Sequence, residues 1–127
     1  MIVVDASAVV AVIFREPAGE MVAEKIDRFD CMMSPMSLVE VTMALARRLD
    51  HAKFVADQYL RESHIKLCAV DAQHAEWAQI AFLTYGKGRH RARLNLGDCF
   101  TYAAAKVLNA PLLYIGDDFA FTDIVAA

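Results

Sequence analysis

The sequence predicts an α/β domain in which a mainly parallel sheet is flanked by helices on both faces. Short apolar runs with strand character alternate along the chain with longer helical segments, as in parallel α/β folds. The chain has 127 residues, of which 57% are hydrophobic, enough to build one core. No repeat, low-complexity segment or linker divides it. We therefore expect a single domain over residues 1–127.

The expected strands lie at about residues 2–4, 31–33, 65–70 and 112–115, and the expected helices at about 6–14, 17–29, 37–49, 51–62, 72–85 and 98–108. β-Branched residues mark the first strand, and Asp5 ends it before a small, apolar helix. Pro17 suits the first turn of the second helix. Ser37 and Glu40 have the S-x-x-E spacing of a capping box, which predicts that the third helix begins there.

The second half continues the alternation. Residues 65–70 alternate enough to form a strand, and Asp71 is a suitable N-cap for the helix that follows. Residues 86–97 are polar and basic, which predicts a loop. From Asp98 onward apolar residues recur at i, i+3, i+4, i+7 and i+8, the period of an amphipathic helix. The last strand then runs into a Gly-Asp-Asp sequence at 116–118.

Composition excludes several classes of function. The formal net charge of −3 argues against a general polyanion binder, so any affinity for nucleic acid must come from a local patch. No apolar run approaches the roughly 20 residues that span a bilayer, and the N-terminus lacks the basic region of a signal peptide. Cys31, Cys68 and Cys99 are widely spaced and odd in number, which favours a reduced interior. We expect a cytoplasmic protein with no membrane contact.

Four acidic positions interrupt apolar sequence at or near the ends of the predicted elements: Asp5, Glu40, Asp98 and Asp117, the last with Asp118 beside it. Ligands bind at the carboxyl edge of parallel sheets, where we expect these acids to converge. Gathered carboxylates repel one another unless a cation lies between them. Mg²⁺, or Mn²⁺ in its place, prefers carboxylate and water oxygens, and no His/Cys set offers zinc an alternative.

Each acid also has a purely structural interpretation. Asp5 and Asp98 could be helix N-caps, Glu40 could be the second member of a capping box, and Asp117 with Asp118 could form a turn. Independent caps, however, have no reason to meet at one edge of one sheet. Their expected convergence favours a metal site.

Several segments together resemble a known family. They are Val4-Asp5-Ala6-Ser7-Ala8, Ser37-Leu38-Val39-Glu40-Val41, Leu94-Asn95-Leu96-Gly97-Asp98-Cys99, Gly116-Asp117-Asp118-Phe119 and Thr122-Asp123. In this order and spacing the chain resembles the PIN domain and, more narrowly, the VapC ribonuclease toxins of bacterial type II toxin–antitoxin modules. The resemblance implies a three-layer PIN-like fold across residues 1–127.

The resemblance also implies roles for particular residues. Asp5, Glu40, Asp98 and one acid of the 117–118 pair would bind the metal and serve catalysis, with Ser7 lending a hydroxyl. We prefer Asp117 as the fourth acid because it comes first after the strand, and leave Asp118 in support. The reaction implied is Mg²⁺-dependent hydrolysis of RNA by an activated water. The partners implied are an RNA substrate, a second copy of the chain, and a VapB-like antitoxin.

A basic run directly precedes Asp98: Lys87, Arg89, Arg91 and Arg93, with His90 among them. Such a run suits phosphate contacts beside a cleavage site, although a solvated loop is the plain alternative.

Two other functions are conceivable on a similar sheet. A phosphotransfer domain or dehalogenase-type phosphatase is disfavoured because the latter needs Asp-x-Asp after the first strand, where this chain has Asp5-Ala6-Ser7. A non-catalytic PIN-like scaffold is disfavoured by the intact acids.

Overall fold

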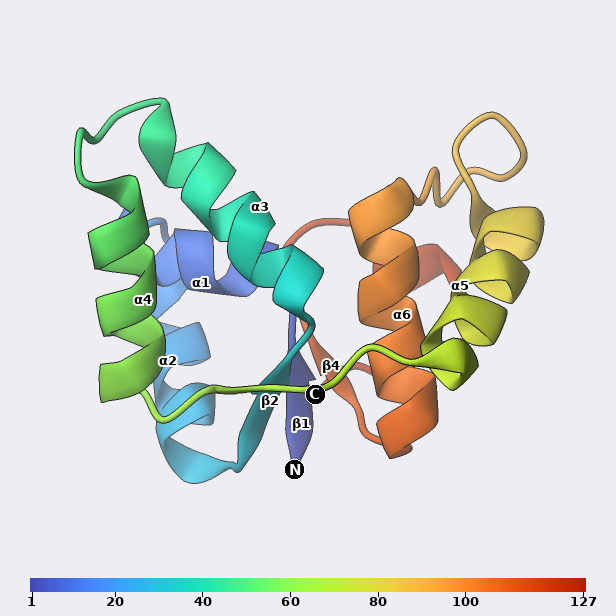
Figure 1. The fold of residues 1–127 in the computed structure, drawn as a ribbon, viewed down its shortest axis with the longest axis horizontal. Coiled ribbons are helices and arrows are strands. Elements are labelled where there is room, and N and C mark those ends of the chain that lie inside the picture. The colour runs from blue at the N-terminus through green and yellow to red at the C-terminus, as the bar shows by residue number, and fades with distance from the viewer.

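The computed structural model describes residues 1–127 and confirms the predicted α/β class (Figure 1). Its elements in chain order are β1 (Ile2–Val4), α1 (Ala6–Ile13), α2 (Gly19–Arg28), β2 (Cys31–Met33), α3 (Pro35–Ala46), α4 (Ala52–Glu62), β3 (Lys66–Leu67), α5 (Ala72–Tyr85), α6 (Leu96–Leu108), β4 (Leu112–Leu113) and the 3₁₀ turn η1 (Phe119–Phe121). No helix has both the length and the apolar character needed to cross a membrane.

The four strands form one parallel sheet in the order β3-β2-β1-β4. The central strand β1 pairs with β2 on one side, where Ile2 is opposite Cys31, and with β4 on the other, where Val4 is opposite Leu113. Because all strands run in one direction, their carboxyl ends lie at one edge. That edge carries Asp5, directly after β1, and the segment that follows β4.

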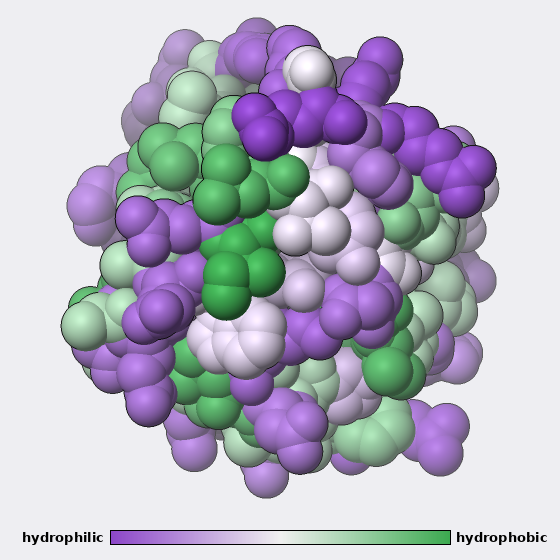
Figure 2. All heavy atoms as spheres, turned by 90° about the vertical axis from the view of Figure 1, so that its right-hand side faces the viewer, coloured by the Kyte–Doolittle hydropathy of each residue, from purple (hydrophilic) through white to green (hydrophobic).

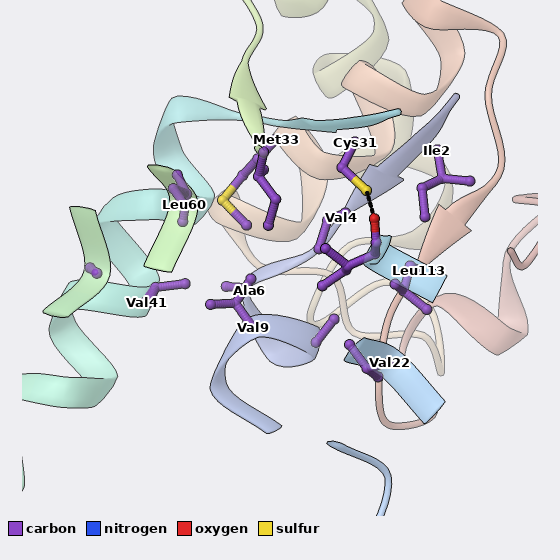
Figure 3. Packing of buried hydrophobic residues seen from close by; sticks show 14 of the residues in the cluster. Ile2, Val4, Ala6, Val9, Val22, Cys31, Met33, Val41, Leu60 and Leu113 are labelled. Atoms are coloured by element: carbon purple, nitrogen blue, oxygen red, sulfur yellow. Dashed lines mark hydrogen bonds between the residues drawn. The ribbon is translucent and has the colours of Figure 1, made fainter. Parts of the chain in front are cut away.

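Alternating side chains of the sheet enter two separate cores, giving three layers. Ile2 and Val4 belong to the core formed with α1 to α4 (Figure 3), and Val3 belongs to the core formed with α5 and α6. All three side chains are almost completely buried. Figure 1 shows the two groups of helices on opposite sides of the sheet.

The start of α3 differs from the prediction. The helix begins at Pro35, and Ser34 is its N-cap, accepting a hydrogen bond from the Met36 amide at 3.3 Å. Proline has no amide hydrogen to leave unsatisfied in the first turn, which favours this earlier start. The predicted capping box of Ser37 and Glu40 is therefore wrong, and both residues lie inside the helix.

Other boundaries also shift. Helix α6 begins at Leu96, two residues before the predicted start, because Asn95 and Asp98 form a reciprocal capping box. Asp98 is thus the third residue of the helix and not its N-cap. Strands β3 and β4 have only two residues each, shorter than expected, because only these residues pair with a neighbouring strand.

Candidate active site

Asp5 lies at the centre of the site and is 6% exposed. It follows β1 and caps α1: its Oδ2 accepts hydrogen bonds from the Ser7 amide at 3.0 Å and the Ser7 hydroxyl at 2.6 Å. Its Oδ1 accepts a hydrogen bond from the Thr101 hydroxyl at 3.1 Å. These three bonds fix the orientation of the carboxylate, so Asp5 is a helix cap and a rigid acid at the same time.

The residues that hold Asp5 also join distant parts of the chain. The Thr101 hydroxyl on α6 lies 2.9 Å from the Ser37 hydroxyl on α3, and both side chains are fully buried. The Ser7 hydroxyl accepts a hydrogen bond from the Ile115 amide at 3.0 Å. Ser7 therefore ties the start of α1 to the segment that leads into the Gly-Asp-Asp turn. In the structure the Ser7 hydroxyl positions Asp5 and the Ile115 segment. Its predicted role of lending this hydroxyl to catalysis stays a prediction.

Glu40 projects from α3 toward the other acids. Its Oε1 is buried and has no hydrogen-bond partner. Burial, and after it the negative charges of Asp5 and Asp98, together raise the pKa of Glu40 to about 7. A carboxylate oxygen buried beside two other acids with no donor is costly unless a cation or proton satisfies it.

Asp98 approaches the same acids from the first turn of α6. It is 9% exposed, and its Oδ2 accepts a hydrogen bond from the Asn95 amide at 3.1 Å. The pKa of Asp98 is raised to about 6, chiefly by burial; the Asn95 hydrogen bond lowers it, and the charges of Asp5 and Asp118 raise it. The capping and metal interpretations of Asp98 are therefore compatible.

The two acids of the Gly-Asp-Asp turn are not equivalent. Both Asp117 and Asp118 are exposed, but the charge of Asp118, and not that of Asp117, contributes to the raised pKa of Asp98. Asp118 precedes the turn η1, whose residue Phe119 is buried against the α5–α6 side of the sheet. This electrostatic effect favours Asp118 as the fourth acid, whereas the sequence favoured Asp117, and the choice stays a prediction.

The donor set fits a hard divalent cation. Asp5, Glu40 and Asp98 offer carboxylate oxygens, the ligands that Mg²⁺ and Mn²⁺ prefer, and the unpartnered Glu40 Oε1 is a ligand without an alternative partner. In this structure, however, no three His, Cys, Asp or Glu side chains lie close enough together to hold an ion between them. Like charges at this spacing repel one another, and a cation bound between them would offset that repulsion.

Cys99, next to Asp98, does not join this chemistry. It is buried in the α5–α6 core, and burial together with the Asp98 charge raises the pKa of its thiol to about 11. It is therefore a neutral thiol that serves packing. Cys31 and Cys68 are also buried and unpaired.

The predicted basic residues lie on the loop between α5 and α6. None of Lys87, Arg89, Arg91 and Arg93 forms an ion pair, so their charges are available to a ligand. The Arg91 guanidinium lies 4.4 Å from the centre of the Phe121 ring, which places this part of the loop beside the turn that follows Asp118. Hydrophilic atoms gather along the upper margin of Figure 2, where Figure 1 places the loop.

Sequence reasoning missed Thr101, Ser37 and Asn95 as parts of the site. Thr101 lies three residues after Asp98, on the same face of α6, and interrupts a run of apolar and small residues. This spacing from Asp98 was the sequence feature that could have identified Thr101 as a site residue. Ser37 was assigned to a cap, and its contact with Thr101 joins residues 64 positions apart, which no local pattern reveals.

Comparison with known proteins identifies the family. The family model described as "PIN domain" matches residues 2–124. The chain is 41% identical over 126 residues to a ribonuclease VapC of Mycolicibacterium smegmatis, covering 98% of each chain. It is 40% identical over 124 residues to ribonuclease VapC30 of Mycobacterium tuberculosis, covering 96% of this chain and 95% of that one.

Solved structures agree on the fold. VapC20 of Mycobacterium tuberculosis, described as a toxin that cleaves the sarcin-ricin loop, superposes with a TM-score of 0.79 at 20% identity, covering 100% of this chain and 98% of that one. A chain of a toxin–antitoxin complex from Klebsiella pneumoniae gives a TM-score of 0.74 at 16% identity, covering 100% and 97%. The chain therefore belongs to the PIN-domain family, within its VapC ribonucleases.

Proposed function

We propose that this chain is a divalent-metal-dependent endoribonuclease, the toxin of a toxin–antitoxin pair, and that Asp5, Glu40 and Asp98 hold Mg²⁺ or Mn²⁺ for its reaction. The observation that carries this proposal is the buried, unpartnered Glu40 Oε1 beside two other acids. A folded protein that keeps such a group unsatisfied does so at a cost in stability, which a functional role explains. The names of the relatives supply the substrate class, RNA.

The residues divide the work according to their contacts. Asp5, fixed by Ser7 and Thr101, is the rigid reference point of the site. Asp98, held by Asn95, approaches it from α6, and Glu40 from α3. When bound, the cation lowers the pKa of a water and neutralises charge on the scissile phosphate. Without the cation, burial and the charges of Asp5 and Asp98 raise the pKa of Glu40, so a proton on its carboxylate would take the place of the cation in relieving the repulsion.

Asp118 is our choice for the fourth acid. Its charge affects Asp98, whereas no such effect of Asp117 on the cluster is found. As an exposed residue it keeps a rotatable carboxylate at the rim, suited to hydrogen-bond a water of the metal shell. Asp117 is then a residue of the turn.

The loop between α5 and α6 supplies the RNA contacts in this proposal. Lys87, Arg89, Arg91 and Arg93 are free of ion pairs and lie on the loop between α5 and the start of α6, where Asp98 is. Their charges would offset the net negative charge of the chain where the phosphate backbone approaches.

We also propose that a VapB-like antitoxin and a second copy of the chain bind this protein in the cytoplasm. Exposed apolar side chains beside the acids support such contacts, notably Val39 and Met43 on α3 and Leu96 at the start of α6. The Klebsiella neighbour comes from a toxin–antitoxin complex.

The deciding experiment compares the wild-type protein with Asp98→Asn on total RNA, with Mg²⁺ and with EDTA. Asparagine retains the size of the side chain and an oxygen that can accept the Asn95 hydrogen bond, so the fold is expected to persist. Asp27→Asn, on the exposed surface of α2, is the matched control. We expect Mg²⁺-dependent cleavage by the wild type and the control only. Equal cleavage by Asp98→Asn, or cleavage unaffected by EDTA, would contradict the proposal.

A further inference from the structure

Gly97 occupies a position where the backbone does not require glycine. It is the second residue of α6, and its φ is not in the left-handed region, unlike those of Gly88 and Gly116. Alanine is the better helix former at such a position, because glycine loses more conformational freedom on folding. The reason for glycine must therefore lie in its surroundings.

Those surroundings are the carboxylate of Glu40. A Cβ placed on Gly97 would overlap Glu40 Oε1 and would lie 2.5 Å from Cδ and 2.8 Å from Oε2. All three nearest atoms belong to this one carboxylate, and none belongs to the backbone. A side chain at position 97 would thus displace the carboxylate of Glu40 before anything else.

The contact between α3 and α6 prevents the helices from separating to relieve this overlap. Ser37 on α3 and Thr101 on α6 share a buried hydrogen bond of 2.9 Å. Glu40 lies three residues after Ser37, and Gly97 lies four residues before Thr101, so the two contacts are one helical turn apart on each helix. The two helices are in direct contact with each other.

We propose that Gly97 is a positioning residue for the acid cluster: the missing side chain creates the space that holds the Glu40 carboxylate beside Asp5 and Asp98. The inference rests on one part of the proposed function, namely that the acid cluster binds a divalent cation. It extends that function to a residue that touches neither metal nor RNA and acts only through Glu40.

The test is a cycle of four proteins: wild type, Gly97→Ala, Glu40→Ala and the double variant, each with Mn²⁺ affinity measured by titration calorimetry. We expect Gly97→Ala to weaken Mn²⁺ binding by about tenfold or more, in the range seen when residues supporting a metal ligand are changed. In the Glu40→Ala background the same substitution should cost nothing further, because the group through which it acts is gone. Gln73→Ala, at the exposed second residue of α5, is the control and should bind normally.

Folding is followed in parallel by thermal melting in EDTA. Because alanine favours the helix and the displaced carboxylate leaves the other acids, the melting temperature of Gly97→Ala should not fall. If this variant does not fold, restoration of folding in the double variant supports the contact, and failure to restore it overturns the inference.

The remaining outcomes separate the two proposals. Wild-type Mn²⁺ affinity in Gly97→Ala, or an equal loss in both backgrounds, overturns the role of Gly97 and leaves the metal site intact. A wild-type protein that binds no Mn²⁺ overturns the proposed metal site. In that case a crystal structure of Gly97→Ala decides the positioning on its own, since an undisplaced Glu40 carboxylate refutes it.

Discussion

Replacing Glu40 with glutamine removes one negative charge from the acid cluster while keeping the shape of the side chain. Burial and the charges of Asp5 and Asp98 raise the pKa of Glu40 to about 7 from an ordinary value of 4.5. At about 1.4 kcal/mol for each tenfold change in proton affinity, the ionised carboxylate opposes folding by about 3 kcal/mol above pH 7. Because the side chain is partly exposed, solvent screening reduces this to about 1–2 kcal/mol.

The sign of the pH dependence follows from the direction of the shift. The folded protein holds the Glu40 proton more tightly than the unfolded chain does, so stability falls as pH rises from about 4.5 to 7. Without metal, Glu40→Gln should therefore be more stable than the wild type by about 1–2 kcal/mol at pH 8. This advantage should shrink toward zero near pH 4, where the wild-type side chain is protonated in both states.

Urea unfolding in EDTA at several pH values measures this difference, with the exposed Glu76→Gln on α5 as the matched control. Addition of Mn²⁺ should reverse the order, because a ligand at 100 times its Kd stabilises the wild type by about 2.7 kcal/mol and the variant by less. A variant less stable than the wild type at pH 8 in EDTA would refute the reasoning, since Glu40 would then have a favourable partner without metal.

Three further outcomes are expected. Thr101→Val removes the hydroxyl bonded to Asp5 and Ser37 and should lower the free energy of unfolding by about 1–3 kcal/mol in urea titrations; an unchanged stability would mean that this buried bond contributes nothing. Asp118→Asn should reduce the rate of RNA cleavage by about 10- to 100-fold, whereas Asp117→Asn should leave it near the wild-type rate in single-turnover assays; the reverse order would restore Asp117 as the fourth acid. Lys87→Gln should reduce the slope of log RNA affinity against log salt concentration by about 1, and an unchanged slope in filter-binding titrations would remove Lys87 from the interface.

Local sequence determined much of this protein. Alternating apolar runs predicted the parallel α/β class, and turn residues predicted most helix ends, as at Asp71, which caps α5 through the amides of Gln73 and His74. These features depend on residues a few positions apart, so the chain alone specifies them. The sequence also singled out the acids as candidates, because each interrupts an apolar run.

Where two local signals competed, the sequence did not decide between them. Ser34-Pro35 and Ser37-x-x-Glu40 each mark a helix start, and the structure uses the first. The outcome depends on the buried Ser37–Thr101 hydrogen bond between α3 and α6, which gives Ser37 a partner inside the fold. Glu40 is thereby left without a capping role and free to face the other acids.

The arrangement of the acids was settled by tertiary structure alone. Asp5 and Thr101 are 96 positions apart, and Glu40 meets Gly97 only because α3 and α6 pack in one register. The choice between Asp117 and Asp118 likewise depends on how the chain turns after β4, with Phe119 buried in the core. Sequence specified which groups carry charge. The packing of helices on the sheet decided which charges lie near one another, because electrostatic coupling depends on distance in space and not on separation along the chain.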